Sequence, residues 1–331
     1  MKAPPSRKAF TLVEIVVAVS ILLILALFVT KIIGATNTTI NLSSRITNTD
    51  SDARLVFNRL SLDFGSLLKR ADVDFWAGNP SAMNGNYLLL FLSGVASDNS
   101  DSPSGGNRNL SLVGYRVAAS DDNPGANRAA MPCLLRAGRA VGWSTSGFVG
   151  LKSNGLPVRF SDTSGQVFPS ALLPTVSSSS TADFDVLAPG VVKMVVGFQL
   201  RPDNASVTLE DGTPVANAQG QIVYSPPIQA LTPAGGGTPV NYVDLSRISA
   251  IVAGLVVVDS ASLKLLAPSQ ATAIAGRFAV PQENVLPVRA WKTTLNDLVS
   301  SLSPGIPLPA LQSVHTYECA FPVVQRGETL P

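Results

Sequence analysis

The sequence predicts an α+β protein, with one long N-terminal helix followed by an antiparallel β-sheet domain that carries long loops. Three observations indicate this. A nearly uncharged apolar run covers residues 10–30, a helical period of apolar residues continues to about residue 70, and short β-rich runs follow. The chain has 331 residues, which is enough for one large domain or two ordinary ones.

The composition argues against a nucleic-acid binder and against an enzyme that uses histidine. The 24 basic and 22 acidic residues leave a net charge of only +2, too little for the basic surface that nucleic acid requires. His315 is the one histidine, and we expect it to be structural. The sequence contains no phosphate-binding glycine loop and no nucleophile motif. We therefore expect a protein that is not an enzyme, with no catalytic residues, no metal, no cofactor and no nucleic-acid partner.

Residues 10–30 form an apolar run that is long enough to cross a membrane once as a helix. Three basic residues and no acid precede it, so the positive-inside rule places residues 1–9 in the cytoplasm and the remaining chain outside. Glu14 lies near the start of this run, where an ionised side chain costs roughly 2.5–3.5 kcal/mol in hydrocarbon. A chain that enters lipid therefore needs a reason to keep this carboxylate.

Three interpretations of this segment are open from the residues alone. A cleaved secretory signal peptide requires a short apolar core and a small-residue cleavage site, whereas this run is long and continues into Lys31-Ile32-Ile33. A plain membrane anchor fits the length but leaves Glu14 unexplained. The third interpretation places a cleavage site before the apolar run.

The sequence KAFTLVEIVVAVSILLIL favours the third interpretation, because it resembles the N-terminal signature of type IV pilins and of the pseudopilins of type II secretion. That family has a short basic leader, a small residue, then F-T-L-x-E and an apolar helix. The resemblance implies that prepilin peptidase cuts between Ala9 and Phe10 and that Phe10 becomes N-methylated. Glu14 is then the fifth residue of the mature chain, where the family places its glutamate. The family usually has glycine at the position of Ala9, and we expect processing to tolerate alanine because it is the closest residue in size.

The resemblance also implies an assembly role for Glu14. Cleavage exposes an α-amino group on Phe10 that is largely protonated near neutral pH. In a fibre core, Glu14 of one subunit pairs with the amine of its neighbour, which cancels two buried charges and favours one axial offset between helices. The alternative is that Glu14 lies at the membrane interface and reaches headgroup water.

A helical period continues beyond the membrane segment. Its apolar face consists of Leu42, Ile46, Ala53, Phe57, Leu60, Phe64 and Leu67, and its polar side of Arg45, Asp52, Arg59, Asp63 and Lys69. One helix is therefore predicted from Phe10 to about Arg70, with the Thr/Asn-rich join after Gly34 as a flexible point. The predicted divisions are a leader at 1–9, a transmembrane assembly helix at 10–33, its continuation at 34–70, and an extracytoplasmic β-rich domain at 71–331.

The domain is predicted to contain a succession of strands and one late helix. The β-rich runs are Asn86–Gly94, Ser111–Ala118, Pro132–Gly138, Gly190–Arg201, Arg247–Asp259 and His315–Val324. The amphipathic piece Trp291–Leu302 predicts the helix. Long surface loops are expected where Ser, Gly, Asn, Asp and Pro gather, at Ser97–Asn109, Ser177–Asp183 and Thr232–Pro239.

The sequences of the predicted strands make the family resemblance more specific. LVGYRVAA, PCLLRAG and VLAPGVVKMVVGFQL are similar to successive strands of the J-type minor pseudopilins, and the length and insertions resemble the Verru_Chthon cassette protein C family. The resemblance implies a minor subunit of a type II secretion pseudopilus or a related fibre. The alternatives are a type IV pilus minor pilin in adhesion or DNA uptake, and a single-pass membrane-anchored binding domain or enzyme.

The partners and the location follow from the same resemblance. The implied partners are a prepilin peptidase, other pilins or pseudopilins, an inner-membrane assembly platform and membrane lipid. The implied location is the bacterial inner membrane, with a single span, a periplasmic domain and incorporation into a pilus or pseudopilus.

Three further features have both a functional and a structural interpretation. Cys133 and Cys319 are a candidate disulfide in an extracytoplasmic domain, or else two separate buried thiols. Asp121-Asp122 could suggest calcium, but two adjacent aspartates without further ligands are more typical of a solvated turn. The tryptophans are expected to be core or helix-docking anchors, and they are Trp76, Trp143 and Trp291.

Overall fold

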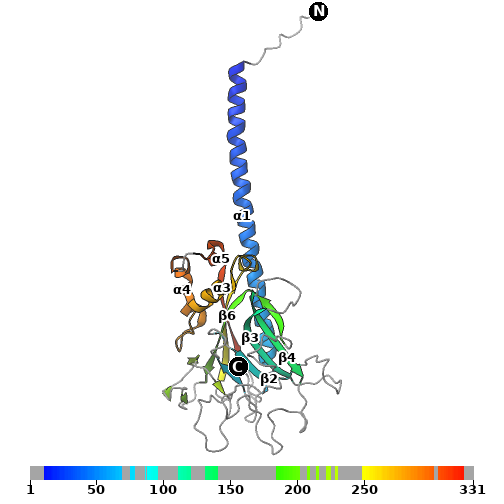
Figure 1. The fold of residues 1–331 in the computed structure, drawn as a ribbon, viewed down its shortest axis with the longest axis vertical. Coiled ribbons are helices and arrows are strands. Elements are labelled where there is room, and N and C mark those ends of the chain that lie inside the picture. Colours follow the sequence, from blue (N-terminus) through cyan, green and yellow to red (C-terminus); the bar gives the residue numbers. More distant parts are fainter. Residues whose placement is uncertain are drawn as a thin grey trace, which may run out of the picture. The chain divides into compact units, whose positions relative to one another are not determined.

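The computed structural model has the predicted α+β arrangement, a long helix followed by antiparallel sheets (Figure 1). It describes residues 11–68, 75–78, 86, 88–95, 111–120, 131–140, 184–201, 207–208, 214–215, 221–224, 228–229, 248–301 and 305–323. The three predicted long loops lie outside these residues. The chain divides into two compact units, Met1–Asn48 and Thr49–Pro331, and helix α1 contributes residues to both.

Helix α1 covers Leu12–Gly65 without interruption, slightly shorter at both ends than the predicted 10–70. The Thr/Asn-rich stretch after Gly34 is helical. There, Thr38 and Thr39 donate their hydroxyls to the carbonyls of Gly34 and Ala35, at 2.9 and 3.0 Å. These poor helix formers are thus accommodated because each hydroxyl finds an acceptor one turn earlier in the same helix.

The second unit contains two main antiparallel sheets. The six-stranded sheet has the order β10-β1-β2-β3-β4-β5, and the four-stranded sheet has the order β12-β11-β6-β9. The first consists of β1 (Trp76–Gly78), β2 (Leu88–Ser93), β3 (Ser111–Ser120), β4 (Met131–Ala140), β5 (Asp185–Pro189) and β10 (Ile228–Gln229). The second consists of β6 (Val191–Leu200), β9 (Ile222–Val223), β11 (Ile248–Val258) and β12 (Val314–Pro322). A separate pair is formed by β7 (Val207–Thr208) and β8 (Pro214–Val215).

The six predicted strands are confirmed as β2, β3, β4, β6, β11 and β12, with ends that differ by a few residues. Strands β6 and β11 are buried along almost their whole length. Continuous burial explains why their sequences are apolar without alternation, since both faces of the four-stranded sheet are covered.

Gly190 connects the two sheets. It follows β5 of one sheet and precedes β6 of the other, its N–H donates to the Pro132 carbonyl at 3.1 Å, and its carbonyl accepts from Val258 at 2.9 Å. Its φ of +79° is a conformation that side chains disfavour, and a Cβ there would lie 2.3 Å from the Val258 carbonyl oxygen. Glycine is therefore required where the chain crosses between the sheets.

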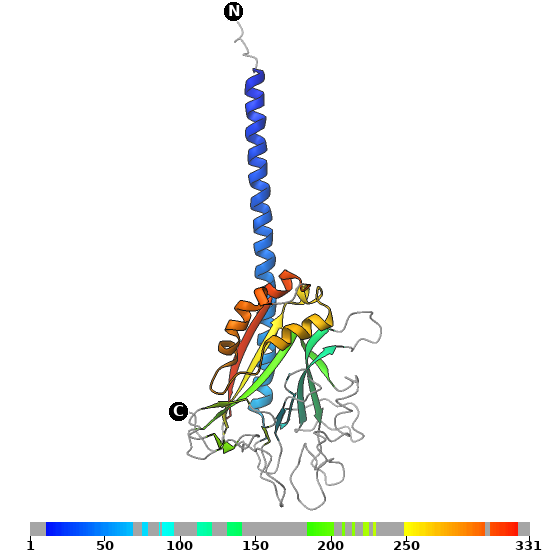
Figure 2. The ribbon, with the colours of Figure 1, turned by 60° about the vertical axis from the view of Figure 1, so that its left-hand side comes forward.

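Helices cover both faces of the four-stranded sheet. The shorter ones are α2 (Ser260–Leu263), α3 (Pro268–Arg277), α4 (Pro287–Ser301) and α5 (Leu308–Gln312). Helix α4 confirms the predicted late helix, and it lies with α3 on one side of the sheet (Figure 2). Phe57 and Phe64 of α1 pack on Phe321 of β12, which belongs to the opposite face from Gly254 and its α4 contacts.

An aromatic cluster joins α1 to both sheets. Phe64 of α1 lies 5.1 Å from Phe91 of β2 and 5.4 Å from Phe321 of β12, between ring centroids. Phe75 continues the cluster, at 5.6 Å from Phe91 and 5.5 Å from Phe198 of β6. The core of the second unit therefore lies between the two sheets and the last part of α1.

Two residues of α1 differ in burial from what the helical period predicts. Ala53, Leu60, Phe64 and Leu67 are buried as expected, and so is Val56, and Phe57 is partly buried. Ile46 is exposed because it precedes the part of α1 that packs on the sheets. Asp63, predicted on the polar side, is fully buried because the sheet supplies partners for its charge. Lys69 and the side chain of Leu42 lie outside the described residues.

Candidate functional site

The first candidate site is the N-terminal part of α1. Among the described residues, α1 is the helix that is long and apolar enough to cross a membrane, judged by length and composition. Its side chains in this part are exposed, with Leu12 at 79%, Leu22 at 65% and Leu27 at 65%. An apolar surface of this extent is typical of a helix that contacts lipid or other apolar helices.

Glu14 lies in the first turn of this helix, where it forms a capping box with Thr11. The Thr11 N–H and Oγ1 donate to Glu14 Oε2 at 2.9 and 3.1 Å, and the Glu14 N–H is 3.3 Å from Thr11 Oγ1. Two N–H groups that a helix start leaves without partners are thereby satisfied, and the negative charge lies at the positive end of the helix dipole. The carboxylate therefore has a local stabilising role within the single subunit.

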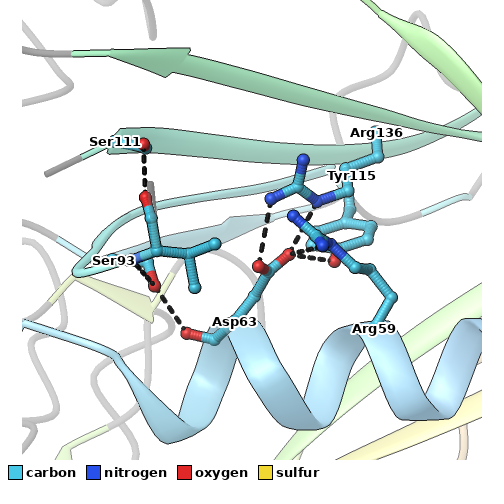
Figure 3. A network of polar contacts seen from close by, with 7 residues as sticks. Arg59, Asp63, Ser93, Ser111, Tyr115 and Arg136 are labelled. Atoms are coloured by element: carbon cyan, nitrogen blue, oxygen red, sulfur yellow. Dashed lines mark hydrogen bonds and ion pairs between the residues drawn. The ribbon is translucent and has the colours of Figure 1, made fainter. Parts of the chain in front are cut away.

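The second candidate site lies where α1 meets the six-stranded sheet (Figure 3). The buried carboxylate of Asp63 accepts two hydrogen bonds from Arg136 of β4, from Nε to Oδ2 at 2.7 Å and from Nη2 to Oδ1 at 3.0 Å. Tyr115 of β3 donates its hydroxyl to Oδ2. Arg59, one turn earlier on α1, places its Nε 3.6 Å from the same oxygen. The carboxylate is thus compensated by a bidentate guanidinium and a phenol, with a second guanidinium nearby.

Two partners of Asp63, Tyr115 and Arg136, have raised pKa values. Burial raises the pKa of the Tyr115 phenol, and the neighbouring charge and hydrogen bond of Asp63 raise it further. Burial would lower the pKa of the Arg136 guanidinium, but the hydrogen bond and charge of Asp63 outweigh it, so the pKa is raised. Tyr115 therefore acts as a neutral phenol donor and Arg136 as a guanidinium cation.

The backbone of Asp63 is held as well as its side chain. Its carbonyl belongs to the last turn of α1, where helical carbonyls lack partners, and it accepts from Ser93 Oγ of β2 at 2.9 Å. The network continues through Val95, whose N–H donates to Ser93 Oγ at 3.4 Å and whose carbonyl accepts from Ser111 Oγ at 2.6 Å. One residue of α1 is therefore bound by three neighbouring strands, β2, β3 and β4.

A family model for the prokaryotic N-terminal methylation motif matches residues 4–30. The chain carries a prepilin motif. Together with the apolar helix that begins at Leu12, this is the arrangement of a type IV pilin-like prepilin. The motif implies processing by a prepilin peptidase and assembly with other pilins. Comparisons with curated proteins and with solved structures gave no significant match.

The structure places the predicted site residues of the prepilin segment only in part. Ala9 and Phe10, the predicted cleavage and methylation positions, lie outside the described residues, as does the leader. Glu14 is described and occupies the first turn of α1. Asp63, Tyr115 and Arg136 form a site that the sequence did not predict, because each belongs to a different element.

The candidate disulfide is not formed. Cys133 and Cys319 are both thiols, as in the alternative interpretation. Cys133 is buried on β4 of the six-stranded sheet, where its Sγ lies 3.4 Å from the Ala118 carbonyl, and Cys319 is partly buried on β12 of the other sheet. The two cysteines thus belong to different sheets.

The remaining sequence candidates have structural surroundings where they are described. Trp291 of α4 is buried, donates Nε1–H to the Ala279 carbonyl at 2.8 Å and packs against Phe278, which confirms it as a core anchor. His315 is partly buried on β12, and burial lowers the pKa of its imidazole although the Asp259 charge opposes this. Asp121-Asp122, Trp143 and the side chain of Trp76 lie outside the described residues.

Proposed function

We propose that this chain is a minor pseudopilin or pilin, a structural subunit of a type II secretion pseudopilus or a related fibre. The observation that carries the proposal is the prepilin motif at residues 4–30, which leads directly into an exposed apolar helix with Glu14 in its first turn. A subunit of this kind works by assembly and not by catalysis.

Maturation would begin with removal of residues 1–9 by a prepilin peptidase. The cut between Ala9 and Phe10 leaves a chain whose first residue is Phe10, and N-methylation of Phe10 keeps a protonated amine at that end. Before and after the cut, the apolar part of α1 serves as the single membrane span, with the domain outside the cytoplasm. An inner-membrane platform then transfers the subunit from lipid to the fibre.

Glu14 would guide this transfer. In lipid, its carboxylate is satisfied by Thr11 at the helix start. In the fibre, the α-amine of a neighbouring subunit is a stronger partner, because two opposite charges in a dry environment compensate each other. The capping box and the intersubunit pair both use the Glu14 carboxylate, so Glu14 can pass from one to the other while it remains at the helix start.

The role of a minor subunit is supported by the strand sequences that resemble J-type pseudopilins and by the size of the domain. A domain of more than 250 residues is difficult to repeat at the small axial rise of a helical fibre. The alternatives are a type IV pilus minor pilin in adhesion or DNA uptake, and a membrane-anchored domain whose helix is only an anchor.

The test separates the charge of Glu14 from its capping role. Glu14→Gln retains a side chain that can cap Thr11 but is neutral, so it cannot form an ion pair with an amine. Thr11→Ala removes the capping hydroxyl and keeps the charge of Glu14. We expect Glu14→Gln to be inserted and cleaved normally but to co-purify with other pilin-like subunits about tenfold less, measured by quantitative mass spectrometry of sheared fibres from its own host.

The matched variant Thr11→Ala should co-assemble at close to the wild-type level. If Glu14→Gln assembles as well as the wild type, the proposed charge pairing is wrong. If neither variant nor the wild type is recovered with other pilin-like subunits, the chain is an anchored domain and the assembly function itself is wrong.

A further inference from the structure

The apolar packing of α1 does not by itself fix where the helix lies along the sheets. The buried residues Val56, Leu60 and Phe64 follow one another at spacings of four. A displacement by one turn, about 5.4 Å, would bring each of them close to the place of the next. An apolar stripe of this kind is therefore nearly degenerate in axial register.

The backbone contacts at the end of α1 are also independent of residue identity. Leu67 forms a β-bridge with Ser93, supported by hydrogen bonds from Leu68 N to the Leu92 carbonyl at 2.9 Å and from Gly94 N to the Ser66 carbonyl at 2.8 Å. The Asp63 carbonyl that accepts from Ser93 is likewise a group that every residue has. Such contacts strengthen the junction, but a shifted helix could form equivalent ones.

The Asp63 carboxylate differs from these contacts because neighbouring turns cannot replace it. A shift of four residues in one direction would bring Arg59 towards Arg136, which opposes two cations. A shift in the other direction would bring the end of α1 at Gly65 there, where the chain has no acidic residue. Either shift would leave the Arg136 guanidinium and the Tyr115 hydroxyl without the carboxylate that compensates them. An uncompensated buried charge is strongly unfavourable, so the observed register is selected over both.

We propose that Asp63, Arg136 and Tyr115 form a register lock that sets the axial position of α1 on the sheets. Tyr115 and Arg136 come from the strand sequences Leu112–Ala119 and Pro132–Gly138. They lie directly opposite each other in the β3–β4 pair. The two strands thus provide the binding position for a single acidic residue of the helix. Asp63 is a positioning residue. If subunits join through α1, as the proposed function requires, the lock would keep the domain at one place along that helix.

The test measures the position of α1 directly, in the full-length chain in detergent. Nitroxide labels are placed on two exposed positions, Leu62→Cys of α1 and Val186→Cys of β5, in a Cys133→Ala/Cys319→Ala background, and their separation is measured by pulsed electron paramagnetic resonance. The chain with an intact lock should give one narrow distance. Asp63→Leu/Arg136→Met/Tyr115→Phe removes the Asp63 and Arg136 charges and the phenol hydroxyl together, and Arg59, whose side chain is 31% exposed, can turn towards solvent. We expect it to fold and to show a second distance population, shifted by about 5 Å.

A single distance equal to that of the intact lock in this triple variant would overturn the proposal, because apolar packing and backbone contacts would then suffice. If the triple variant does not fold, Asp63→Asn replaces it. The carboxamide preserves the shape but not the charge, and the same second population is expected, while one unshifted distance again overturns the proposal.

Asp50→Asn/Arg54→Gln is the matched control, since it removes an exposed ion pair of 2.9 Å on the same helix and should leave the distance unchanged. The distances do not depend on assembly. Failure of the lock would therefore leave the proposed function standing, and failure of the Glu14→Gln test would leave the lock standing.

Discussion

At the scale of single residues, burial changes the chemistry of Lys193. This residue lies on β6, on the same face of the four-stranded sheet as Gly254, and it is only 3% exposed. Burial disfavours the charged ammonium group and lowers the pKa of Lys193 to about 8, from its ordinary value of 10.5. A shift of that size makes a measurable contribution to the pH dependence of folding.

The sign of this contribution follows from proton binding. Between pH 8 and 10.5 the unfolded chain keeps a proton on Lys193 that the folded chain has released, so raising the pH favours the folded state. The stability of the wild type relative to Lys193→Met should therefore rise by roughly 3 kcal/mol from pH 7 to pH 11. Chemical denaturation of both proteins across this range checks it, and a difference that stays constant would show that Lys193 titrates normally in the fold.

Asp63 illustrates at the same scale what a sequence pattern misses. The helical period correctly selected Ala53, Leu60 and Phe64 because apolar residues at that spacing share a face. The same rule assigned Asp63 to the polar side, since a lone charge is normally solvated. Its burial depends on Arg136, 73 positions away in the chain, and no local pattern reports a partner at that distance.

At the scale of the elements, α4 rests on the sheet through a close contact at Gly254 of β11. A Cβ at this position would lie 2.4 Å from Pro287 Cβ and 3.1 Å from the ring of Trp291. These atoms belong to the first turns of α4, which Glu318 of β12 also fixes by accepting a hydrogen bond from the Val288 N–H at 2.9 Å. Glycine is thus needed here for close approach between helix and strand.

Gly254→Ala should therefore lower the free energy of unfolding by about 1–3 kcal/mol, because the added methyl overpacks the contact between α4 and the sheet. The emission of the buried Trp291 should change at the same time, since its surroundings must open. The matched change is Gly276→Ala on α3, where nothing lies within 4 Å and alanine favours the helix, so stability should rise by roughly 0.5–1 kcal/mol. Equal effects of the two substitutions would contradict the packing that we describe.

The elements differ in how well the sequence predicted them, and the strength of their apolar pattern explains the difference. The ten- and eleven-residue strands β6 and β11 were evident as long apolar runs. Helix α3 was missed because two of its three buried residues are alanines, Ala271 and Ala275, which give only a weak apolar period around Ile274. Its start is set by Gln270, which accepts from the Ala267 N–H at 2.7 Å and donates to the Gly305 carbonyl at 2.8 Å. The second of these contacts comes from 35 positions away, so local sequence could not indicate it.

At the scale of the whole molecule, the sequence predicted the division into an apolar N-terminal helix and a β-rich domain better than it predicted the contacts within that domain. The exposed apolar part of α1, the capping position of Glu14 and the prepilin motif all belong to one short segment, and short segments are readable from sequence. The contacts within the domain depend on residues far apart in the chain. Under the proposed function, the short segment would govern how the subunit is delivered and joined, whereas the contacts within the domain hold the sheets on the last part of α1.

The central claim is that this chain is a prepilin that is processed before its apolar helix, and one measurement tests it most directly. The protein is extracted from the membranes of its own host, and its intact mass and N-terminal residue are determined. We predict a chain that begins at Phe10, lacks residues 1–9 and carries one added methyl group. A chain that retains residues 1–9, or one that begins after the apolar run, would contradict the claim.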